Sequence, residues 1–296
     1  MWVESLALRG ICRGSQARRQ RLNESTVLVG TAIMSPSLPP EILDFIVDDL
    51  HDEPTTLKTC CIVSRSWVPR ARKHLFAHVE FHASKSHFEM WKGAFPDPSN
   101  SPARHTRTLS IYGIPAPTAT DEEVDSWIRA FHSVVHLRLE SLNQAALLPF
   151  YGLSPTVRSL RLTYTTPEIF PFVCSFPLLE DLALVGLDYQ TDAGGWNAPL
   201  TSPKLTGSLD LRVFGSVRPV VRRLLDLPDG LHFSKITVLF SEEAVALVMD
   251  LVSRCSCTLE SLAIIYSPMG AFPSVPVTIQ YLTVTRRCRR GRDALT

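Results

Sequence analysis

The sequence has almost no net charge, no long apolar run and no cysteine pairs spaced for metal binding. Its 296 residues carry 30 Lys and Arg against 29 Asp and Glu, a formal net charge of +1, and this balance does not favour nucleic acid as a partner. The apolar stretches fall far short of the roughly 18 residues that a membrane-spanning helix needs, so no membrane partner is expected. An apolar fraction of 45% with 20% charged residues is typical of a globular chain and excludes wholesale disorder.

Cysteine is too irregularly spaced for a disulfide framework or a structural zinc site. The chain has seven cysteines, an odd number, without a C-x-x-C spacing, which favours reduced thiols acting as small buried apolar side chains. Reduced thiols are typical of the cytoplasm and the nucleus, and these compartments are the expected location. The seven are Cys12, Cys60, Cys61, Cys174, Cys255, Cys257 and Cys288.

The sequence also lacks the motifs of common catalytic chemistry. It has no glycine-rich phosphate loop, no G-x-S-x-G, no H-E-x-x-H and no kinase signature. His74, His78 and His82 recur every four residues, a spacing that leaves a metal enzyme or hydrolase open as an alternative. Because a helix ending near residue 76 would hold at most two of these ligands, we expect a non-catalytic protein with no cofactor and no metal.

Basic residues gather at both ends of the chain. Residues 1–34 carry five Arg and two Glu, and residues 286–296 carry five Arg and one Asp, so the part between them is net acidic. Such ends are typical of solvated tails. We expect a disordered N-terminal extension over residues 1–34, of which 1–33 precede a second methionine, and a basic C-terminal tail over 286–296.

A helical pattern begins at residue 38, where the chain reads LPPEILDFIVDDLHDEPTTLKTCCIVSRSWVPRARKHLF. Proline fits the first turn of a helix, where its missing N–H would be unpaired, and Glu41 suits the positive end of the helix dipole. Further short helices are expected at residues 55–63 and 67–76. Three helices in about 40 residues bury little surface by themselves, so this unit is expected to lean on another part or partner.

This segment resembles the F-box, in the form common among fungal F-box proteins. The shared features are the Leu38-Pro39-Pro40-Glu41-Ile42 opening, Ile46 and Leu50 on the first helix, Leu57 after the break, the Val63-Ser64-Arg65-Ser66-Trp67 signature and the His74-Leu75-Phe76 close. The resemblance implies an F-box-like domain over residues 35–81 that docks onto the Skp-type adaptor of a Skp–cullin–F-box ubiquitin ligase and, through it, reaches the cullin.

The resemblance also assigns roles to single residues. It implies that an apolar helical surface enters a groove of the adaptor, while Trp67 and Phe76 hold the three helices together. The implied adaptor contacts are Leu38, Pro39, Ile42, Ile46, Leu57 and Val63. The alternative is an ordinary helical cap whose apolar residues are all internal.

Beyond residue 102 a second pattern recurs, in which two aliphatic residues are separated by one. Six of the eight pairs also have an apolar residue three positions earlier, with Thr106 and Thr206 as the exceptions. The pattern resembles the L-x-x-L-x-L core of leucine-rich repeats at an irregular period. The pairs are Leu109/Ile111, Leu137/Leu139, Leu160/Leu162, Leu182/Leu184, Leu209/Leu211, Ile236/Val238, Leu262/Ile264 and Leu282/Val284.

The alternation predicts short parallel strands that stack their paired aliphatics inside. We therefore expect an α/β fold: a small all-α three-helix F-box, a linker or helix over residues 82–101, and an irregular leucine-rich-repeat-like solenoid with a parallel sheet over 102–285. Helices are expected near 120–131, 220–227 and 242–253. Asn or Cys, common in such repeats three residues after the second aliphatic, is missing, which predicts a looser horseshoe.

The residues that alternate with the paired aliphatics along each strand, between them or next to them, should face outward and form the target-binding surface. Their character changes along the array from polar to apolar, and a loop over residues 186–202 is expected to cover the apolar part. The candidates are Tyr112, Arg138, Arg161, Val185, Leu239 and Ile265.

Together these patterns predict a non-catalytic substrate receptor of a ubiquitin ligase. Its partners would be the Skp-type adaptor and an unidentified target protein, and it would act by raising the target's effective concentration near the ligase. The alternative is a leucine-rich-repeat interaction scaffold that works independently of ubiquitination.

Overall fold

The computed structural model describes residues 39–82, 86–113, 121–142, 144–163, 169–189, 203–215, 217–228, 230–240 and 244–266. Across these ranges the chain forms an α/β structure with nine α-helices and one eight-stranded parallel sheet. None of the helices in these ranges is long and apolar enough to cross a membrane. The expected tails, residues 1–34 and 286–296, lie outside the described ranges.

The first three helices are close to those predicted: α2 (Pro40–Asp49), α3 (Pro54–Val63) and α4 (Val68–Leu75). Each has a proline at one of its first two positions, where no backbone donor is lost to the helix. The three helices enclose a small core, which consists of Val47, Leu57, Cys60, Ala71 and Leu75.

The sheet follows chain order without a crossover, and every neighbouring pair is parallel. Seven of the eight predicted aliphatic pairs lie in β2–β8 and stack in register, so that Leu137 aligns with Leu160 and Leu139 with Leu162. The eighth pair, Leu282/Val284, lies outside the described residues. The strands are β1 (His78–His82), β2 (Thr108–Tyr112), β3 (His136–Glu140), β4 (Ser159–Thr163), β5 (Asp181–Tyr189), β6 (Ser208–Gly215), β7 (Lys235–Phe240) and β8 (Ser261–Tyr266).

Strand β1 was not predicted from the sequence. It lies where the F-box-like segment was expected to end, and its Val79 and Phe81 pair in register with the first predicted aliphatic pair. Phe76 stands three residues before Val79, so the same spacing recurs one repeat earlier than we assigned it. The sheet therefore begins directly after α4, and helix α5 (His87–Ala94) lies in the segment expected to be a linker.

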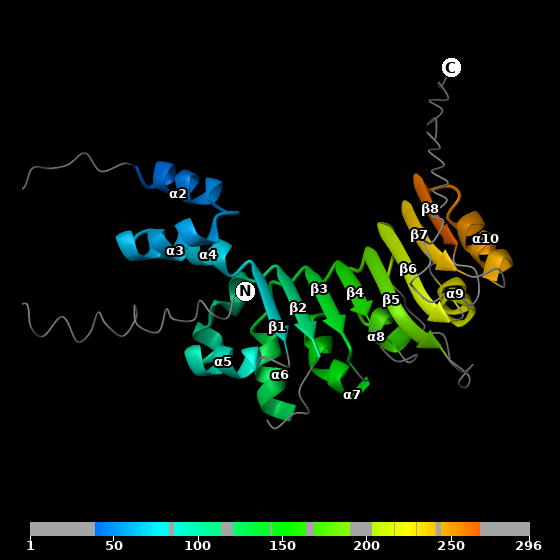
Figure 1. The fold of residues 1–296 in the computed structure, drawn as a ribbon, viewed down its shortest axis with the longest axis horizontal. Helices are drawn as coiled ribbons and strands as arrows, with labels where there is room; N and C mark the ends of the chain where they lie inside the picture. The colour runs from blue at the N-terminus through cyan, green and yellow to red at the C-terminus, as the bar shows by residue number, and fades with distance from the viewer. Residues whose placement is uncertain are drawn as a thin grey trace, which may run out of the picture.

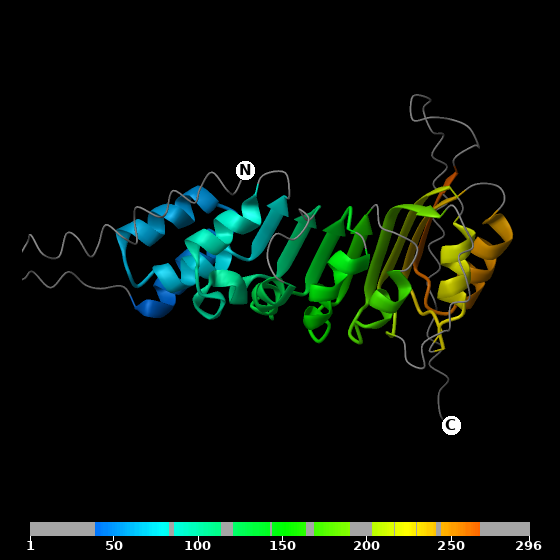
Figure 2. The same ribbon diagram turned by 90° about the horizontal axis from the view of Figure 1, so that it is seen from below.

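The connections between strands contain short helices on one face of the sheet (Figures 1 and 2). Between these helices and the strands lies the main core, which includes the paired aliphatics and several fully buried phenylalanines. Complete burial of one such side chain stabilises the fold by about 1.5–3 kcal/mol. The connecting helices are α5, α6 (Asp121–Arg129), α7 (Gln144–Leu147), α8 (Phe170–Cys174), α9 (Arg218–Leu225) and α10 (Val245–Arg254), with 3-10 turns at Pro98–Asn100, Pro102–His105 and Leu148–Leu153.

The helices α2–α4 stand at the β1 end of the strand stack (Figure 1). Phe76, directly after α4, packs against both the small core and the main core. Its ring meets Trp91 of α5 edge-on, with centroids 5.7 Å apart, and Phe95 in the same way at 5.9 Å. The two apolar cores are thus joined through one aromatic side chain.

Candidate partner-binding surfaces

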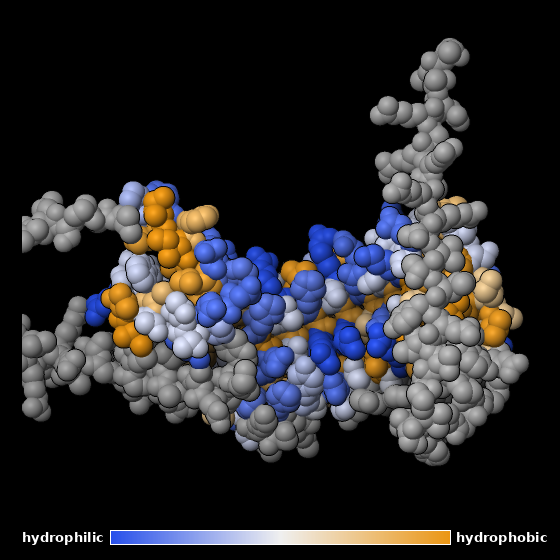
Figure 3. All heavy atoms as spheres, turned by 45° about the horizontal axis from the view of Figure 1, so that its top comes forward, coloured by the Kyte–Doolittle hydropathy of each residue, from blue (hydrophilic) through white to orange (hydrophobic). Residues whose placement is uncertain are grey.

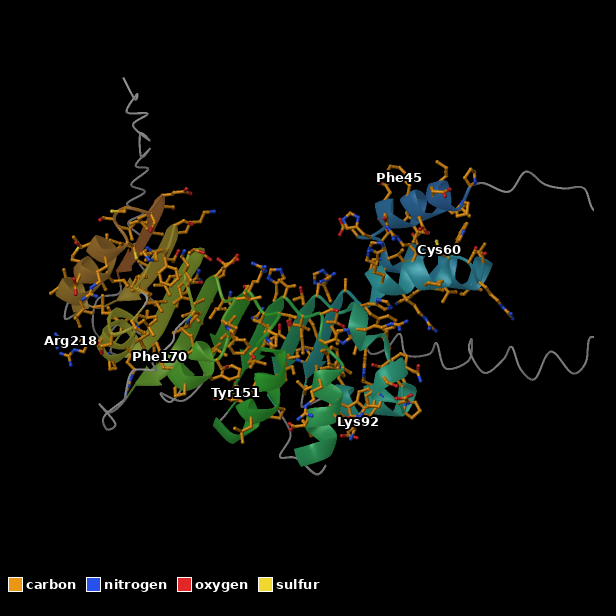
Figure 4. The ribbon with its side chains drawn as sticks, turned by 180° about the vertical axis from the view of Figure 1, so that it is seen from behind. Phe45, Cys60, Lys92, Tyr151, Phe170 and Arg218 are labelled. Carbon is orange, nitrogen blue, oxygen red and sulfur yellow. The ribbon has the colours of Figure 1, made fainter. Side chains whose placement is uncertain are left out.

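Helix α2 keeps one apolar face in the solvent. Ile42, Phe45 and Ile46 occupy positions i, i+3 and i+4, which lie on one side of a helix, and their exposed fractions are 47%, 71% and 41%. Val47, on the other side, is 1% exposed and belongs to the small core. Figure 4 shows Phe45 on the outer side of α2. We call these three residues the α2 surface.

Helix α3 exposes apolar residues only at its C-terminal end. Ile62 and Val63 are 62% and 65% exposed, while Cys60 lies within the small core. Leu57 corrects one expectation: at 1% exposure it is enclosed by α2–α4 and is not available to a partner. The reason is that α3 packs along α4, which turns the Leu57 side of α3 inward.

The remaining residues of the F-box-like segment are two expected adaptor contacts, Pro39 and Leu38, and two residues expected to hold the helices together, Trp67 and Phe76. Pro39 is exposed at the start of α2, and Leu38 lies outside the described residues. Trp67 and Phe76 are partly buried and pack against the small core. The apolar residues that the N-terminal helices expose to solvent are therefore Pro39, the α2 surface and the two residues at the end of α3.

A charged cluster fixes α2 against α4 (Asp48, Arg70 and His74). The Asp48 carboxylate accepts two hydrogen bonds from the Arg70 guanidinium, one from Nε at 2.5 Å and one from Nη2. Its Oδ1 also lies 2.6 Å from His74 Nε2. These bonds to Arg70 and then His74 hold the pKa of Asp48 well below its ordinary value. The cluster orients α2 so that Val47 faces inward and the α2 surface outward.

The second candidate surface is the outer face of the sheet, which we define as the face turned away from the paired aliphatics. Figure 3 shows hydrophilic side chains gathered over its middle strands. Arg138 of β3 and Arg161 of β4 are register partners, each at the middle of its strand. Tyr112 lies on β2, the neighbour of β3. The structure therefore brings the three polar candidates together.

Aromatic and charged groups stack at the β1 end of this face. His82 lies flat against Tyr112, with ring centroids 4.4 Å apart and planes tilted by 8°. The Arg138 guanidinium sits 5.2 Å from the centre of the Tyr112 ring, a cation–π distance. His82 was not a candidate from sequence, because only the unpredicted strand β1 places it beside Tyr112.

The apolar candidates lie farther along the same face. Val185, Leu239 and Ile265 share the row that begins with His82, but Arg212 interrupts it between Val185 and Leu239. The face is therefore less apolar than the sequence suggested. Residues 186–189 of the expected covering loop belong to β5, and residues 190–202 lie outside the described ranges.

The histidine pattern does not form a metal site. His74 ends α4 against Asp48, whereas His78 and His82 lie on a strand, so one helix never carries all three. No group of three or more potential metal ligands occurs within the described ranges. Burial raises the pKa of the Cys255 thiol and raises that of Cys174 to about 11, which keeps both protonated and poorly nucleophilic at neutral pH.

Comparison with known proteins adds no relative. No protein-family model matches the sequence, and none of the curated proteins searched matches it.

Proposed function

We propose that this chain is a substrate-receptor subunit of a Skp–cullin–F-box ubiquitin ligase. In this proposal residues 35–81 form an F-box whose exposed helical residues dock onto the Skp-type adaptor. The strands β1–β8 form an irregular leucine-rich-repeat-like solenoid whose outer face holds the target protein. The protein has no covalent step to perform, because it acts by raising the effective concentration of the target near the ligase.

The observation that carries this proposal is the exposure of large apolar side chains on α2 and α3. Five large apolar residues there are at least 41% exposed, in a stretch that also carries the F-box signature. Three of them gather on one face of α2, and exposed apolar groups that gather in one place cost solvation free energy and are typical of partner-binding sites. The five are Ile42, Phe45, Ile46, Ile62 and Val63.

The arrangement of the elements also supports two partners at once. The α2 surface belongs to helices at the β1 end of the strand stack, and the polar candidates of the outer face lie on β2–β4 (Figure 1). A partner held by α2 would leave these strands free. A chain of this form can therefore connect an adaptor to a target.

Co-purification of the full chain with a Skp-type adaptor tests the proposal. The double variant Ile42→Asp, Ile46→Asp places two charges on the α2 surface and should abolish capture of the adaptor. The matched control is Val245→Asp, Met249→Asp, which makes the same i, i+4 change at two exposed residues of α10. Circular dichroism should show that both variants keep the helical content of the wild type.

Two results would overturn the proposal. One is equal capture of adaptor by the wild type and the α2 variant, which would place the contact elsewhere. The other is no capture by the wild type, and this second result favours a leucine-rich-repeat scaffold independent of ubiquitination. That candidate keeps the outer face as a binding surface and makes α2–α4 a cap.

A further inference from the structure

We infer that Arg138, Arg161 and Thr163 form a site for an anionic oxygen group, a phosphoryl or carboxylate group carried by a target peptide. This inference rests on the proposed function, since it names the chemistry by which the outer face would recognise a target. Three observations carry it: the pairing of the arginines, their unused donors and the orientation of Arg138.

Two arginines stand side by side at the centre of the outer face. Arg138 of β3 and Arg161 of β4 are register partners on parallel strands, which lie about 4.8 Å apart. Like charges at directly neighbouring positions of a sheet destabilise each other. Such a pair becomes favourable when an anion lies between the two guanidinium groups.

Two other arginines near these strands are already matched by carboxylates. Arg158 Nη1 lies 2.5 Å from Glu180 Oε1, and Arg212 Nε lies 2.9 Å from Asp210 Oδ1. Arg138 has only Glu140, at 3.7 Å, and Arg161 has no ion pair with a carboxylate in the described part of the chain. Only one of the two central arginines therefore has a carboxylate partner, which is loosely held, and the pair keeps an excess positive charge.

Unused hydrogen-bond donors occur on the same two neighbouring strands. The Nε atoms of Arg138 and Arg161 and the hydroxyl of Thr163 are buried without a hydrogen-bond partner among the described residues. Thr163 is 6% exposed although it faces outward, two residues beyond Arg161 on the same strand. Buried donors of this kind carry a desolvation cost that a bound oxygen ligand removes.

Stacking holds one of the two guanidinium groups in position. Arg138 rests over Tyr112, which is itself stacked on His82, so this contact restricts the Arg138 side chain before a ligand arrives. A restricted guanidinium group suits the two-oxygen geometry of a phosphate or carboxylate and lowers the entropy lost on binding. Glu140 is the nearest competitor and would exchange for the ligand.

A peptide is a better occupant than a nucleic acid strand. The outer face carries Glu80, Glu140, Asp181 and Asp210 around the two arginines, so positive charge is local and does not form a continuous track. A strand of phosphates would be repelled by these carboxylates on either side. A single anionic side chain that meets both arginines would have to displace only Glu140, the one carboxylate that contacts Arg138 in the described part of the chain.

The probe is the short peptide acetyl-Gly-phosphoserine-Gly-amide, titrated into the full chain and followed through the NMR signals of the arginine Nε–H groups. We expect saturable shifts of Arg138 and Arg161, and at least about tenfold weaker binding in Arg161→Gln, because one charge-assisted contact is worth about that factor. Arg161→Lys should recover part of the loss, since the charge returns without the fork. Arg212→Gln, on the same face but paired with Asp210, is the control and should bind like the wild type.

Two further peptides, with glutamate or unmodified serine in place of phosphoserine, separate the sources of the anion. Binding of the phosphoserine peptide alone assigns the site to a phosphate, and binding of both anionic peptides assigns it to any such group. Equal binding of the serine peptide, no effect of Arg161→Gln, or tighter binding of a ten-nucleotide single strand would overturn the inference. The Ile42→Asp, Ile46→Asp variant should still bind the probe, so failure of the adaptor proposal remains distinguishable from failure of this site.

Discussion

Phe76 and Trp91 meet edge-on, with ring centroids 5.7 Å apart and planes at 85°, at the junction between the N-terminal helices and the strand stack. Phe76 packs against both apolar cores, and Trp91 belongs to the larger one. The junction thus depends on a side chain that closes the helical segment and also occupies the first position of the repeating pattern.

Truncation of this ring should loosen the junction. Phe76→Ala is expected to lower the free energy of unfolding by about 3 kcal/mol, as is typical of a large aromatic side chain removed from a core. Limited proteolysis should then cut first between α4 and β1. Phe45→Ala removes the same ring from a position that is 71% exposed, and should change stability by less than about 0.5 kcal/mol. Equal losses from the two variants would contradict a structural role for Phe76.

Leu57 and Val63 make a second comparison, within helix α3. Leu57 is 1% exposed and Val63 is 65% exposed, although both were expected on one docking surface. Leu57→Ala should cost about 3 kcal/mol of stability through the cavity it leaves, whereas Val63→Ala should cost less than about 0.5 kcal/mol. Urea denaturation measures both. A neutral Leu57→Ala would mean that the small core does not enclose this residue in solution.

The strand pattern was predictable because it depends on local spacing alone. Paired aliphatics with period two face one side of a strand, and equivalent positions in neighbouring repeats must align for the stack to bury them. Hence the pairs that begin at Leu109, Leu137 and Leu160 occupy register-matched positions. The same spacing around Val79 was present, but the resemblance of the preceding residues to a helical domain led us to end that domain at residue 81.

Which apolar residues face the solvent was less predictable. Helix α2 carries apolar residues over a broad surface, and only its contact with α4 decides that Val47 is inside and Phe45 outside. The candidate anion site shows the same limit. Arg138 and Arg161 were identified by their outward alternation, and the same alternation turns Thr163 outward, but only the structure shows that the Thr163 hydroxyl is buried.

The contact of Asp48 with Arg70 and His74 should make stability depend on pH. Hydrogen bonds from these partners lower the pKa of Asp48 below its ordinary value of 3.8, so the folded state favours the ionised carboxylate. The resulting stabilisation is complete above about pH 4 and is lost as the pH falls toward the lower folded-state pKa. Asp48→Asn should cost about 1 kcal/mol at pH 7, a value limited by solvent screening of a partly exposed pair.

Denaturation at several pH values tests this expectation. The difference in unfolding free energy between the wild type and Asp48→Asn should shrink steadily below about pH 4, because the wild-type carboxylate takes up its proton. Asp49→Asn changes an exposed neighbour on the same helix and serves as the control. A difference that stays constant down to pH 2 would show that the charge of Asp48 contributes nothing.

Gly207 lies before β6 at a point where the chain has no room for a side chain. A Cβ there would overlap the Asp181 carboxylate and lie 3.2 Å from the carbonyl oxygen of Glu180. The carboxylate cannot move aside freely, because its Oδ1 accepts hydrogen bonds from Ser208 N at 2.6 Å and from Ser208 Oγ at 2.7 Å. Gly207→Ala should therefore destabilise the fold by about 2 kcal/mol, in the range of other overpacked sites.

The double variant Asp181→Ala, Gly207→Ala separates this clash from a general effect of substituting glycine. Asp181→Ala alone loses the two bonds to Ser208, but it also opens the space that the new methyl group needs. The double variant should then be more stable than the sum of the single losses predicts, by about 1 kcal/mol, as expected for residues in contact. Urea denaturation of the four proteins gives this coupling energy, and additivity within about 0.3 kcal/mol would mean that Asp181 is not the obstacle.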